Sequence, residues 1–297
     1  MESQDLISPG VPIPRPNYKI LKDPIKNEQL ITNGYIVLPM LDDIQVKYFN
    51  DLYKKWHPTA PDNFYKSYFS ADKTYKEIVE NSIAEHFAPK LEEYFIDYKA
   101  FGAMFVVKPS GDKGHIPPHQ DWSFVDETKH WSLNSWCPLI DTTGQNGNIQ
   151  MLPGSHLFMK TVRGAGTPEL YSHLYDVIQP NLVDIPIKAG DAIFFYHGII
   201  HCSTYNYNSE PRVCLGTSII QKNVPIYYHF LKPGETHADK FEVDCDFYTN
   251  YVNHRDAFPK DAKYLGIEEN TFYRFTNMEI TNLIRDFASK NALTWKP

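Results

Sequence analysis

The spacing of hydrophobic positions changes along this chain, and the change predicts where its elements lie. From Leu41 to Trp56 apolar side chains recur every three or four residues, which predicts a helix with one buried face, capped by Asp42 or Asp43. A second helix is expected over residues 73–95, interrupted near Pro89. A third is expected near the C-terminus, where the helical period holds at Ile280, Leu283, Ile284 and Phe287.

The middle of the chain has a different pattern. The stretch from Asn33 to Leu41 and the region from about Phe101 to Gln221 contain short β-type runs, separated by Gly, Pro and Asn. The central runs are "FGAMFVVK", "SLNSWCPLI", "GNIQMLPG", "LVDIPIK", "DAIFFYHGIIHCSTY" and "RVCLGTSII". Helices followed by about eight short strands predict a mainly β protein of the α+β class, with a barrel or sandwich and helices packed on one side.

The same pattern predicts how the chain is organised. Residues 1–27 are polar and Pro-rich, which predicts an extended arm, and residues 28–297 are expected to form a single domain. Within it the barrel core is expected over about 96–221, followed by an extension over about 222–297 that ends in the terminal helix. Residues 155–180 have weak strand character and are interpreted as a loop or lid. Residues 222–275 are polar and rich in Tyr, and their pattern predicts no element.

Composition narrows the function classes. The net charge is −7 and no run of Lys or Arg is present, which argues against a nucleic-acid or anionic-membrane surface. No window approaches 18 consecutive apolar residues, the four cysteines show no CxxC spacing, and the N-terminus lacks the features of a secretory signal. We therefore expect a cytoplasmic protein with a small-molecule substrate and neither a nucleic-acid nor a membrane partner.

The stretch "YHGIIH" places His197 and His201 four residues apart, as in zinc-binding helices. Gly198 and the β-branched pair that follows it disfavour a helix and favour a buried strand. On one strand the two histidines would lie about 13 Å apart, at about 3.3 Å per residue, too far to share a metal ion. At most one of them is therefore expected to be a ligand.

The other ligands of a metal site are sought in His-x-Asp triplets, because two histidines and one carboxylate commonly hold a redox metal in a barrel. Three triplets occur: His119-Gln120-Asp121, His237-Ala238-Asp239 and His254-Arg255-Asp256. Only the first is followed by further strands, by His201 and then by Arg212. An Fe(II) site of this kind is paired with 2-oxoglutarate, whose distal carboxylate suits a bidentate arginine. If Ser203 pairs opposite Arg212 across the hairpin "YNYNSEP", both point into one pocket with His201.

At this point the chain resembles the phytanoyl-CoA dioxygenase family of Fe(II)- and 2-oxoglutarate-dependent oxygenases. The similarity spans residues 33–221, and five segments match in order: "NGYIVLPMLDDIQV", "MFVVKPSG", "PPHQDWSF", "SWCPLID…NGNIQMLPGSH" and "AGDAIFFYHGIIHCSTYNYNSEPR". The resemblance implies a double-stranded β-helix, the jelly-roll barrel of the cupins, with flanking helices. It implies that His119, Asp121 and His201 bind Fe(II), that Arg212 and Ser203 hold 2-oxoglutarate, and that Met104 and Trp136 line the cosubstrate pocket.

The resemblance also implies the reaction: with Fe(II), 2-oxoglutarate and O₂, hydroxylation of an unactivated C–H bond with release of succinate and CO₂. A carboxylate at Asp121 argues against halogenation, whereas desaturation and ring formation stay open. Candidate substrate contacts are residues 63–69, Trp122, and a lid around Lys160 and Arg163, which would suit a small polar or amino-acid-like metabolite of natural-product metabolism. Two alternatives stay open: a cupin-type metal-dependent oxygenase or isomerase that does not use 2-oxoglutarate, and a non-catalytic barrel that acts as a binding module.

Overall fold

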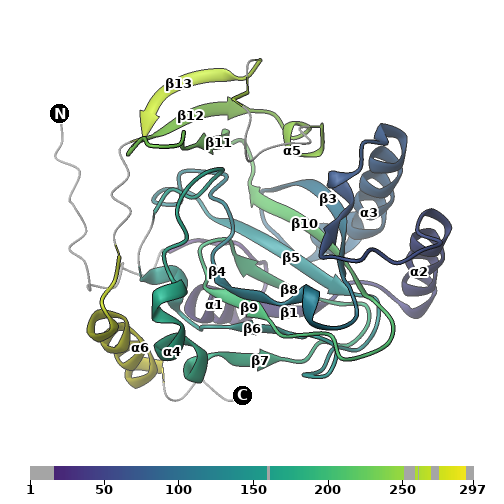
Figure 1. Cartoon of the computed structure of the whole chain (residues 1–297), viewed down its shortest axis with the longest axis horizontal. Helices are drawn as coiled ribbons and strands as arrows, with labels where there is room; N and C mark the ends of the chain where they lie inside the picture. The colour runs from purple at the N-terminus through teal and green to yellow at the C-terminus, as the bar shows by residue number, and fades with distance from the viewer. Residues whose placement is uncertain (1–16, 159–160, 251–257, 260, 269–273, 292–297) are drawn as a thin grey trace.

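The computed structural model describes residues 17–158, 161–250, 258–259, 261–268 and 274–291. The longer helices lie near the two ends of the described chain and most strands lie between them, as labelled in Figure 1. The α-helices are α1 (Pro24–Asn33), α2 (Asp43–Trp56), α3 (Lys73–Tyr94), α4 (Tyr175–Ile178), α5 (Phe247–Asn250) and α6 (Asn277–Asn291). Short 3-10 turns are η1 (Ser67–Phe69), η2 (Asp112–Gly114), η3 (Ser155–Leu157), η4 (Ser172–Leu174) and η5 (Gln179–Asn181). None of the helices in these ranges is long and apolar enough to cross a membrane.

The strands form three antiparallel sheets. A six-stranded sheet has the order β1-β8-β5-β10-β3-β2, a four-stranded sheet the order β4-β9-β6-β7, and a three-stranded sheet the order β11-β12-β13. The bounds are β1 (Tyr35–Pro39), β2 (Tyr65–Lys66), β3 (Tyr98–Lys108), β4 (Ile116–His119), β5 (Ser132–Pro138), β6 (Ile149–Met151), β7 (Val183–Ile185), β8 (Asp191–Tyr196), β9 (His201–Ser203), β10 (Arg212–Gln221), β11 (Ile226–Phe230), β12 (Ala238–Val243) and β13 (Lys263–Glu268).

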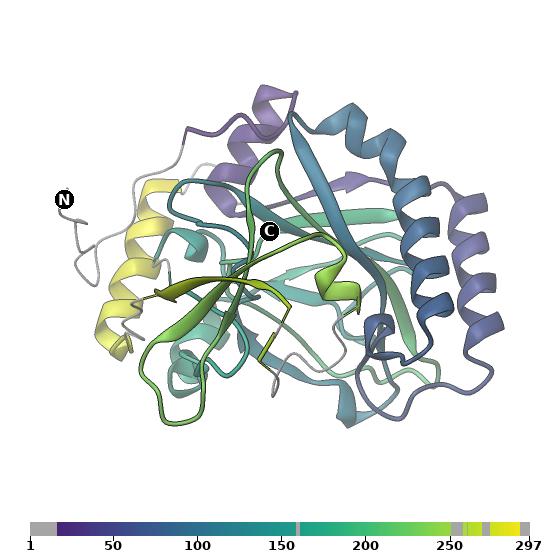
Figure 2. The ribbon, with the colours of Figure 1, turned by 90° about the horizontal axis from the view of Figure 1, so that it is seen from above.

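The two larger sheets enclose the barrel interior, and alternation along their strands sorts side chains between two cores. On β8, Phe194 packs toward the helices, in one apolar cluster with Phe49 of α2 and Phe87 of α3. Its neighbours Ile193 and Phe195 face the other way and pack with Met151 and Trp136 between the sheets. Figure 2 shows α2 and α3 along one flank of the barrel and α6 along another. The predicted mainly β fold with flanking helices is thereby confirmed.

The predicted helices form, with one difference in α3. Asp42 caps α2, and its carboxylate and the side chain of Gln45 make a reciprocal capping box. The predicted interruption near Pro89 is wrong, because α3 runs through Pro89 without a break. Proline removes the hydrogen bond to the carbonyl of Glu85. Both residues lie on the exposed face of the helix, where water can bind that carbonyl.

Two other predictions of local structure need correction. The extended arm predicted to reach residue 27 ends earlier, because Asp23 caps α1 and Pro24 occupies its first position, where a proline is favoured. The stretch "YHGIIH" is not one strand: β8 ends at Tyr196, a turn closes with the Ile199 amide donating to the Tyr196 carbonyl, and β9 begins at His201 in the other sheet.

The described residues of the segments 155–180 and 222–268 pack around the barrel. The first segment forms short helical turns, and its apolar residues Leu170, Leu174 and Ile178 pack against Ile280 and Leu283 of α6. The second forms the three-stranded sheet and α5. This sheet lies over one end of the barrel, outside both of its sheets (Figure 1). The polar pattern of this region predicts no element, whereas in the structure its apolar residues pack on the barrel and on each other.

Candidate metal centre and cosubstrate pocket

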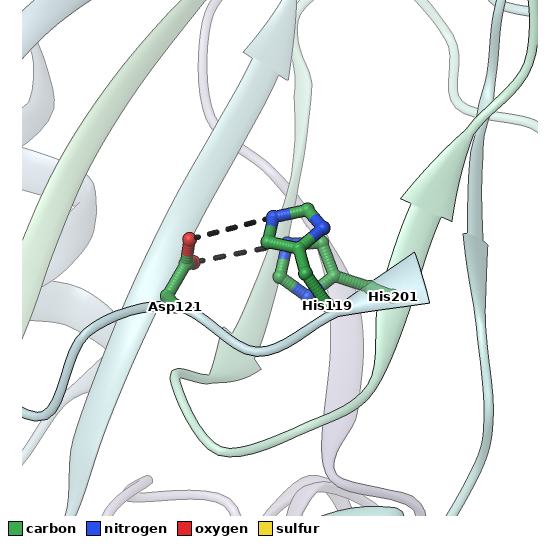
Figure 3. Close-up of side chains that lie close together, drawn as sticks. All are labelled: His119, Asp121 and His201. Carbon is green, nitrogen blue, oxygen red and sulfur yellow. Dashed lines mark ion pairs between the residues drawn. The ribbon is translucent and has the colours of Figure 1, made fainter. Parts of the chain in front are cut away.

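Three predicted ligands meet at one point between the barrel sheets. His119 is the last residue of β4, His201 is the first of β9, and the two are directly opposite in the antiparallel register. Asp121 follows β4 by two residues, and its carboxylate oxygens lie 3.9 Å from Nε2 of His119 and 3.8 Å from Nε2 of His201 (Figure 3). One ligand atom from each of the three residues fits within 4.8 Å of the others. The geometry therefore unites residues that are about eighty positions apart.

The two imidazoles are prepared to donate electron pairs from Nε2. Nδ1 of His119 donates to the carbonyl of Pro117 at 2.9 Å, and Nδ1 of His201 donates to the carbonyl of Ile199 at 3.0 Å. Because a carbonyl only accepts, the proton of each neutral ring is on Nδ1 and Nε2 carries a free lone pair. Such hydrogen bonds are typical of histidines that bind a metal. The donor set fits a divalent transition metal held by two histidines and one carboxylate.

Asp121 is held from two sides. Its Oδ2 accepts a hydrogen bond from Nδ2 of Asn134 at 2.8 Å, and its backbone amide donates to the carbonyl of His197 at 2.9 Å. Burial acts to raise the pKa of Asp121, but His201 and His119 outweigh that effect and hold the pKa below its usual range. The carboxylate is therefore ionised at neutral pH, in the form that binds a metal ion. Burial also lowers the pKa of His201 to about 4, so its ring is neutral.

A cavity of about 830 Å³ opens beside these ligands. All seven residues predicted for the iron and cosubstrate sites line it: Met104, His119, Asp121, Trp136, His201, Ser203 and Arg212. Its volume suits a small molecule and a cosubstrate together.

Arg212 forms a positively charged end of this cavity. It is only 2% exposed, its guanidinium lies 4.6 Å from the centre of the Trp136 ring, and its Nη1 donates to the carbonyl of Gly147. Its Nε has no hydrogen-bond partner, and no carboxylate pairs with the guanidinium in the described part of the chain. Burial lowers the pKa of the neighbouring Lys108 to about 7, and the charge of Arg212 adds to that effect. A buried guanidinium without a protein carboxylate is suited to an anionic ligand.

The predicted pairing of Ser203 with Arg212 is wrong, although both residues line the cavity. Ser203 on β9 lies opposite Ile116 and Ile149 in the four-stranded sheet, whereas Arg212 on β10 lies opposite Lys108 in the six-stranded sheet. The loop after Ser203 is therefore not a hairpin turn but a crossing between the sheets. The two side chains approach the cavity from its two walls instead of from adjacent strands.

Of the other candidate substrate contacts, some line the cavity and some do not. Phe64, Lys66, Tyr68 and Phe69 of the segment 63–69 line the cavity, as does Trp122. Arg163 does not: it is buried in an ion pair with Glu127, with Nη2 2.8 Å from a carboxylate oxygen, and Lys160 lies outside the described residues. Since no described residue between 155 and 180 lines the cavity, the predicted lid is not found there.

The remaining His-x-Asp triplets form no comparable cluster in the described residues. Asp239 is engaged by Lys232, whose Nζ lies 2.8 Å from its carboxylate, and His237 bonds through Nδ1 to the hydroxyl of Thr236. His254 lies outside the described residues. The metal candidate supported by geometry is therefore the triplet at His119.

Sequence reasoning missed several residues that the fold brings to the cavity. Asn134, which holds Asp121, stands on β5, and Tyr248 and Thr249 come from α5 in the C-terminal extension. No local signal marks them, since an asparagine in a strand or a tyrosine in a polar region has many possible roles. Only their positions in space show their connection to the site.

Comparison with known proteins is consistent with this arrangement. The sequence profile described as phytanoyl-CoA dioxygenase (PhyH) matches residues 39–214. A phytanoyl-CoA dioxygenase from Arabidopsis thaliana is 32% identical over 126 residues, which are 41% of this chain and 44% of that protein. The phytanoyl-CoA dioxygenase domain-containing protein 1 from Danio rerio is 27% identical over 146 residues, 46% of this chain and 50% of the relative. The chain thus spans about half the length of these curated relatives.

Solved structures share the fold at lower sequence identity. EvdO2 from Micromonospora carbonacea var. aurantiaca superposes with a TM-score of 0.54 at 17% identity, over 67% of this chain and 91% of that chain. The carbocyclase SnoK of nogalamycin biosynthesis superposes with a TM-score of 0.50 at 16% identity, over 82% and 96%. These similarities confirm the predicted double-stranded β-helix. Because the family profile covers more than half of its residues, this chain belongs to the phytanoyl-CoA dioxygenase family.

Proposed function

We propose that this protein is an Fe(II)- and 2-oxoglutarate-dependent oxygenase that hydroxylates a C–H bond of a small molecule and releases succinate and CO₂. The observation that carries the proposal is the cluster of His119, Asp121 and His201 in one cavity with the buried Arg212. A metal ligand set with an anion-binding arginine in the same cavity suits a chelating dicarboxylate. The structure of EvdO2 with 2-oxoglutarate bound, which shares this fold, supports the choice of cosubstrate.

The protein groups have distinct tasks in this proposal. Nε2 of His119, Nε2 of His201 and the carboxylate of Asp121 would hold the metal on one side, which leaves positions on the other side for ligands. Bound Fe(II) with 2-oxoglutarate would supply the oxidising chemistry with O₂. Asn134 and the backbone of His197 keep the carboxylate of Asp121 in place, so the ligand set is formed before the metal arrives.

Arg212 and Ser203 would hold the distal carboxylate of 2-oxoglutarate. The guanidinium is oriented by the carbonyl of Gly147 and by the ring of Trp136, so little of its mobility remains to be lost on binding. Met104 would lie along the cosubstrate in the same cavity. The apolar and aromatic walls would keep water from the reacting centre and position the C–H bond.

The proposal is tested by anaerobic titration with Fe(II) and 2-oxoglutarate, which should produce the weak visible charge-transfer band of the chelate. The band should be lost in His119→Ala, because one of three ligands is removed. His115→Ala is the matched control, since His115 is an exposed histidine just before the same strand and should leave the band unchanged. A wild-type protein without the band, or a band that survives in His119→Ala, would contradict the site assignment.

A further inference from the structure

The C-terminal extension contributes a wall to the cavity, although it lies outside the region matched by the family profile. Tyr248 and Thr249 on α5 line the cavity, whereas the profile ends at residue 214. Helix α5 packs against β3 and against η1, the turn that contains Phe69. Residues from the extension therefore stand beside other cavity residues and not on a separate surface.

Three aromatic rings meet in this wall, from strand β3, from the loop after β4 and from helix α5. The ring of Tyr248 lies 4.8 Å from that of Phe124 at an interplanar angle of 80°, and 6.0 Å from that of Phe101. The rings of Phe101 and Phe124 are 5.5 Å apart and perpendicular. All three residues line the cavity, and Phe124 follows the metal ligand Asp121 by only three positions. The wall is therefore close along the chain to the proposed reacting centre.

The wall is held in a defined position. The hydroxyl of Tyr248 donates to the carbonyl of Tyr227 on β11, and the amide of Tyr227 donates to the carbonyl of Phe124 at 2.8 Å. On the other side the buried Lys76 of α3 donates to the carbonyl of Thr249 at 2.7 Å. The extension is thus tied both to the loop that carries the metal ligand and to the helical layer. A rigid aromatic surface can bind a ring with little loss of side-chain entropy.

The charges of the cavity restrict the ligand further. Among the described residues that line it, Asp121 is the only acidic one, and that carboxylate belongs to the metal centre. A cationic group on a ligand would therefore lose its hydration without gaining a carboxylate partner. Lys66 and Arg212 line the same cavity and would repel it.

We propose that α5 and the three-stranded sheet form a substrate-recognition element, in which Tyr248, Phe101 and Phe124 bind a flat apolar ring system that carries no cationic group. This inference rests on the proposed function, because it assigns the substrate class of the same site. The ring would lie against the aromatic wall while its C–H bond is presented to the metal centre.

The inference is tested by isothermal titration calorimetry with two probes that share a ring system, 2-naphthalenemethanol and 2-naphthalenemethylamine. The full chain is titrated both with Ni(II) and 2-oxoglutarate present and without added metal. Wild type should bind the alcohol, and should bind the amine at least about tenfold more weakly. No binding of the alcohol, or equal binding of the amine, would overturn the inference.

Variants then locate the binding surface. Tyr248→Leu should weaken binding of 2-naphthalenemethanol about tenfold, because the ring contact is lost, whereas Tyr248→Phe should stay within about threefold. Phe247→Leu is the matched control on the same helix, since Phe247 does not line the cavity. Phe101→Leu removes a ring of the same wall from β3, and it replaces Tyr248→Leu as the test of the binding surface if Tyr248→Leu does not fold. Wild-type affinity in a folded Tyr248→Leu or, failing that, in Phe101→Leu would overturn the inference.

The two proposals fail separately. If the wild-type protein showed no charge-transfer band, the proposed oxygenase function would be wrong. Probe binding without added metal would still test the aromatic wall. A normal band together with unselective probe binding would leave the function intact and remove the substrate class.

Discussion

At the scale of single residues, the two candidate histidine ligands share one local hydrogen-bond arrangement. Both histidines bind the carbonyl two residues before them through Nδ1, His119 to Pro117 and His201 to Ile199. Pro117 lies on β4 itself, whereas Ile199 lies in the turn just before β9, so the backbone immediately before each ligand orients its ring. Asn134 is different, since it reaches Asp121 from β5 and is brought there only by sheet pairing.

Arg212 offers a sharp test at this scale. Arg212→Lys should weaken 2-oxoglutarate binding by about 10–100-fold, because a lysine cannot keep both hydrogen bonds of a guanidinium to one carboxylate. 2-Oxopentanoate has the same chelating end but no distal carboxylate, so its affinity should change much less. Both affinities are measured by titrating the charge-transfer band. Equal losses for the two acids would show that Arg212 acts on the fold and not on the distal carboxylate.

At the scale of elements, the passage from β8 to β9 decides the site. The turn at His197 and Gly198 transfers the chain from the six-stranded to the four-stranded sheet, so that His201 faces His119. His197 stays behind, with Nδ1 2.7 Å from the hydroxyl of Ser132. The expectation that only one histidine of "YHGIIH" could join the metal site agrees with this geometry, although the single strand on which it rested is wrong.

The C-terminal sheet should be sensitive to acid because of His229 on β11. This buried residue lies opposite Lys240, and burial with the charge of Lys240 lowers its pKa to about 3. The ordinary pKa of a histidine is about 6.5, so below that pH His229 is protonated in the unfolded chain but stays neutral in the folded protein. Stability from this group is present above about pH 6.5 and is lost as the pH falls toward 3.

Urea unfolding near pH 7 and near pH 5 measures this effect. Wild type should lose about 2 kcal/mol of unfolding free energy through His229 between these values, and His229→Gln should lose correspondingly less. His237→Gln, which alters an exposed histidine before β12, is the control and should behave as wild type. The same pH dependence in His229→Gln and wild type would rule out His229 as the source.

At the scale of the whole molecule, both barrel sheets, the turn η1 and the helix α5 contribute residues to one cavity. The ligand set belongs to the folded state alone, because His119 and His201 meet only when the four-stranded sheet forms. Ligands that bind the folded state and not the unfolded chain shift the folding equilibrium toward the former.

Metal and cosubstrate should therefore stabilise the fold. Ni(II) with 2-oxoglutarate, at about 100 times their dissociation constants, should add about 2.7 kcal/mol and raise the melting temperature by a few degrees. A chelator should reverse the shift, and Asp121→Ala should show none, since it lacks one ligand. Differential scanning calorimetry gives the answer, and a full shift in Asp121→Ala would place the metal elsewhere.

What the sequence determined by itself was local chemistry and order along the chain. The helical and strand periods predicted the elements, and His119, Asp121, His201 and Arg212 could be selected because their types and order suit one kind of site. The family resemblance on the same segments was confirmed by the profile over residues 39–214. Periodicity, residue type and order along the chain are properties of the sequence alone, so these inferences needed no knowledge of which strands pair.

Only the tertiary structure decided which distant residues contact one another. It placed Ser203 and Arg212 on different sheets, brought Asn134 to Asp121, and joined Tyr248 to Phe101 and Phe124. Pairing between distant segments depends on burial of one face against another and on where the chain turns. A sequence pattern with a period of two describes which side chains share a face, but it does not contain the identity of the opposite strand.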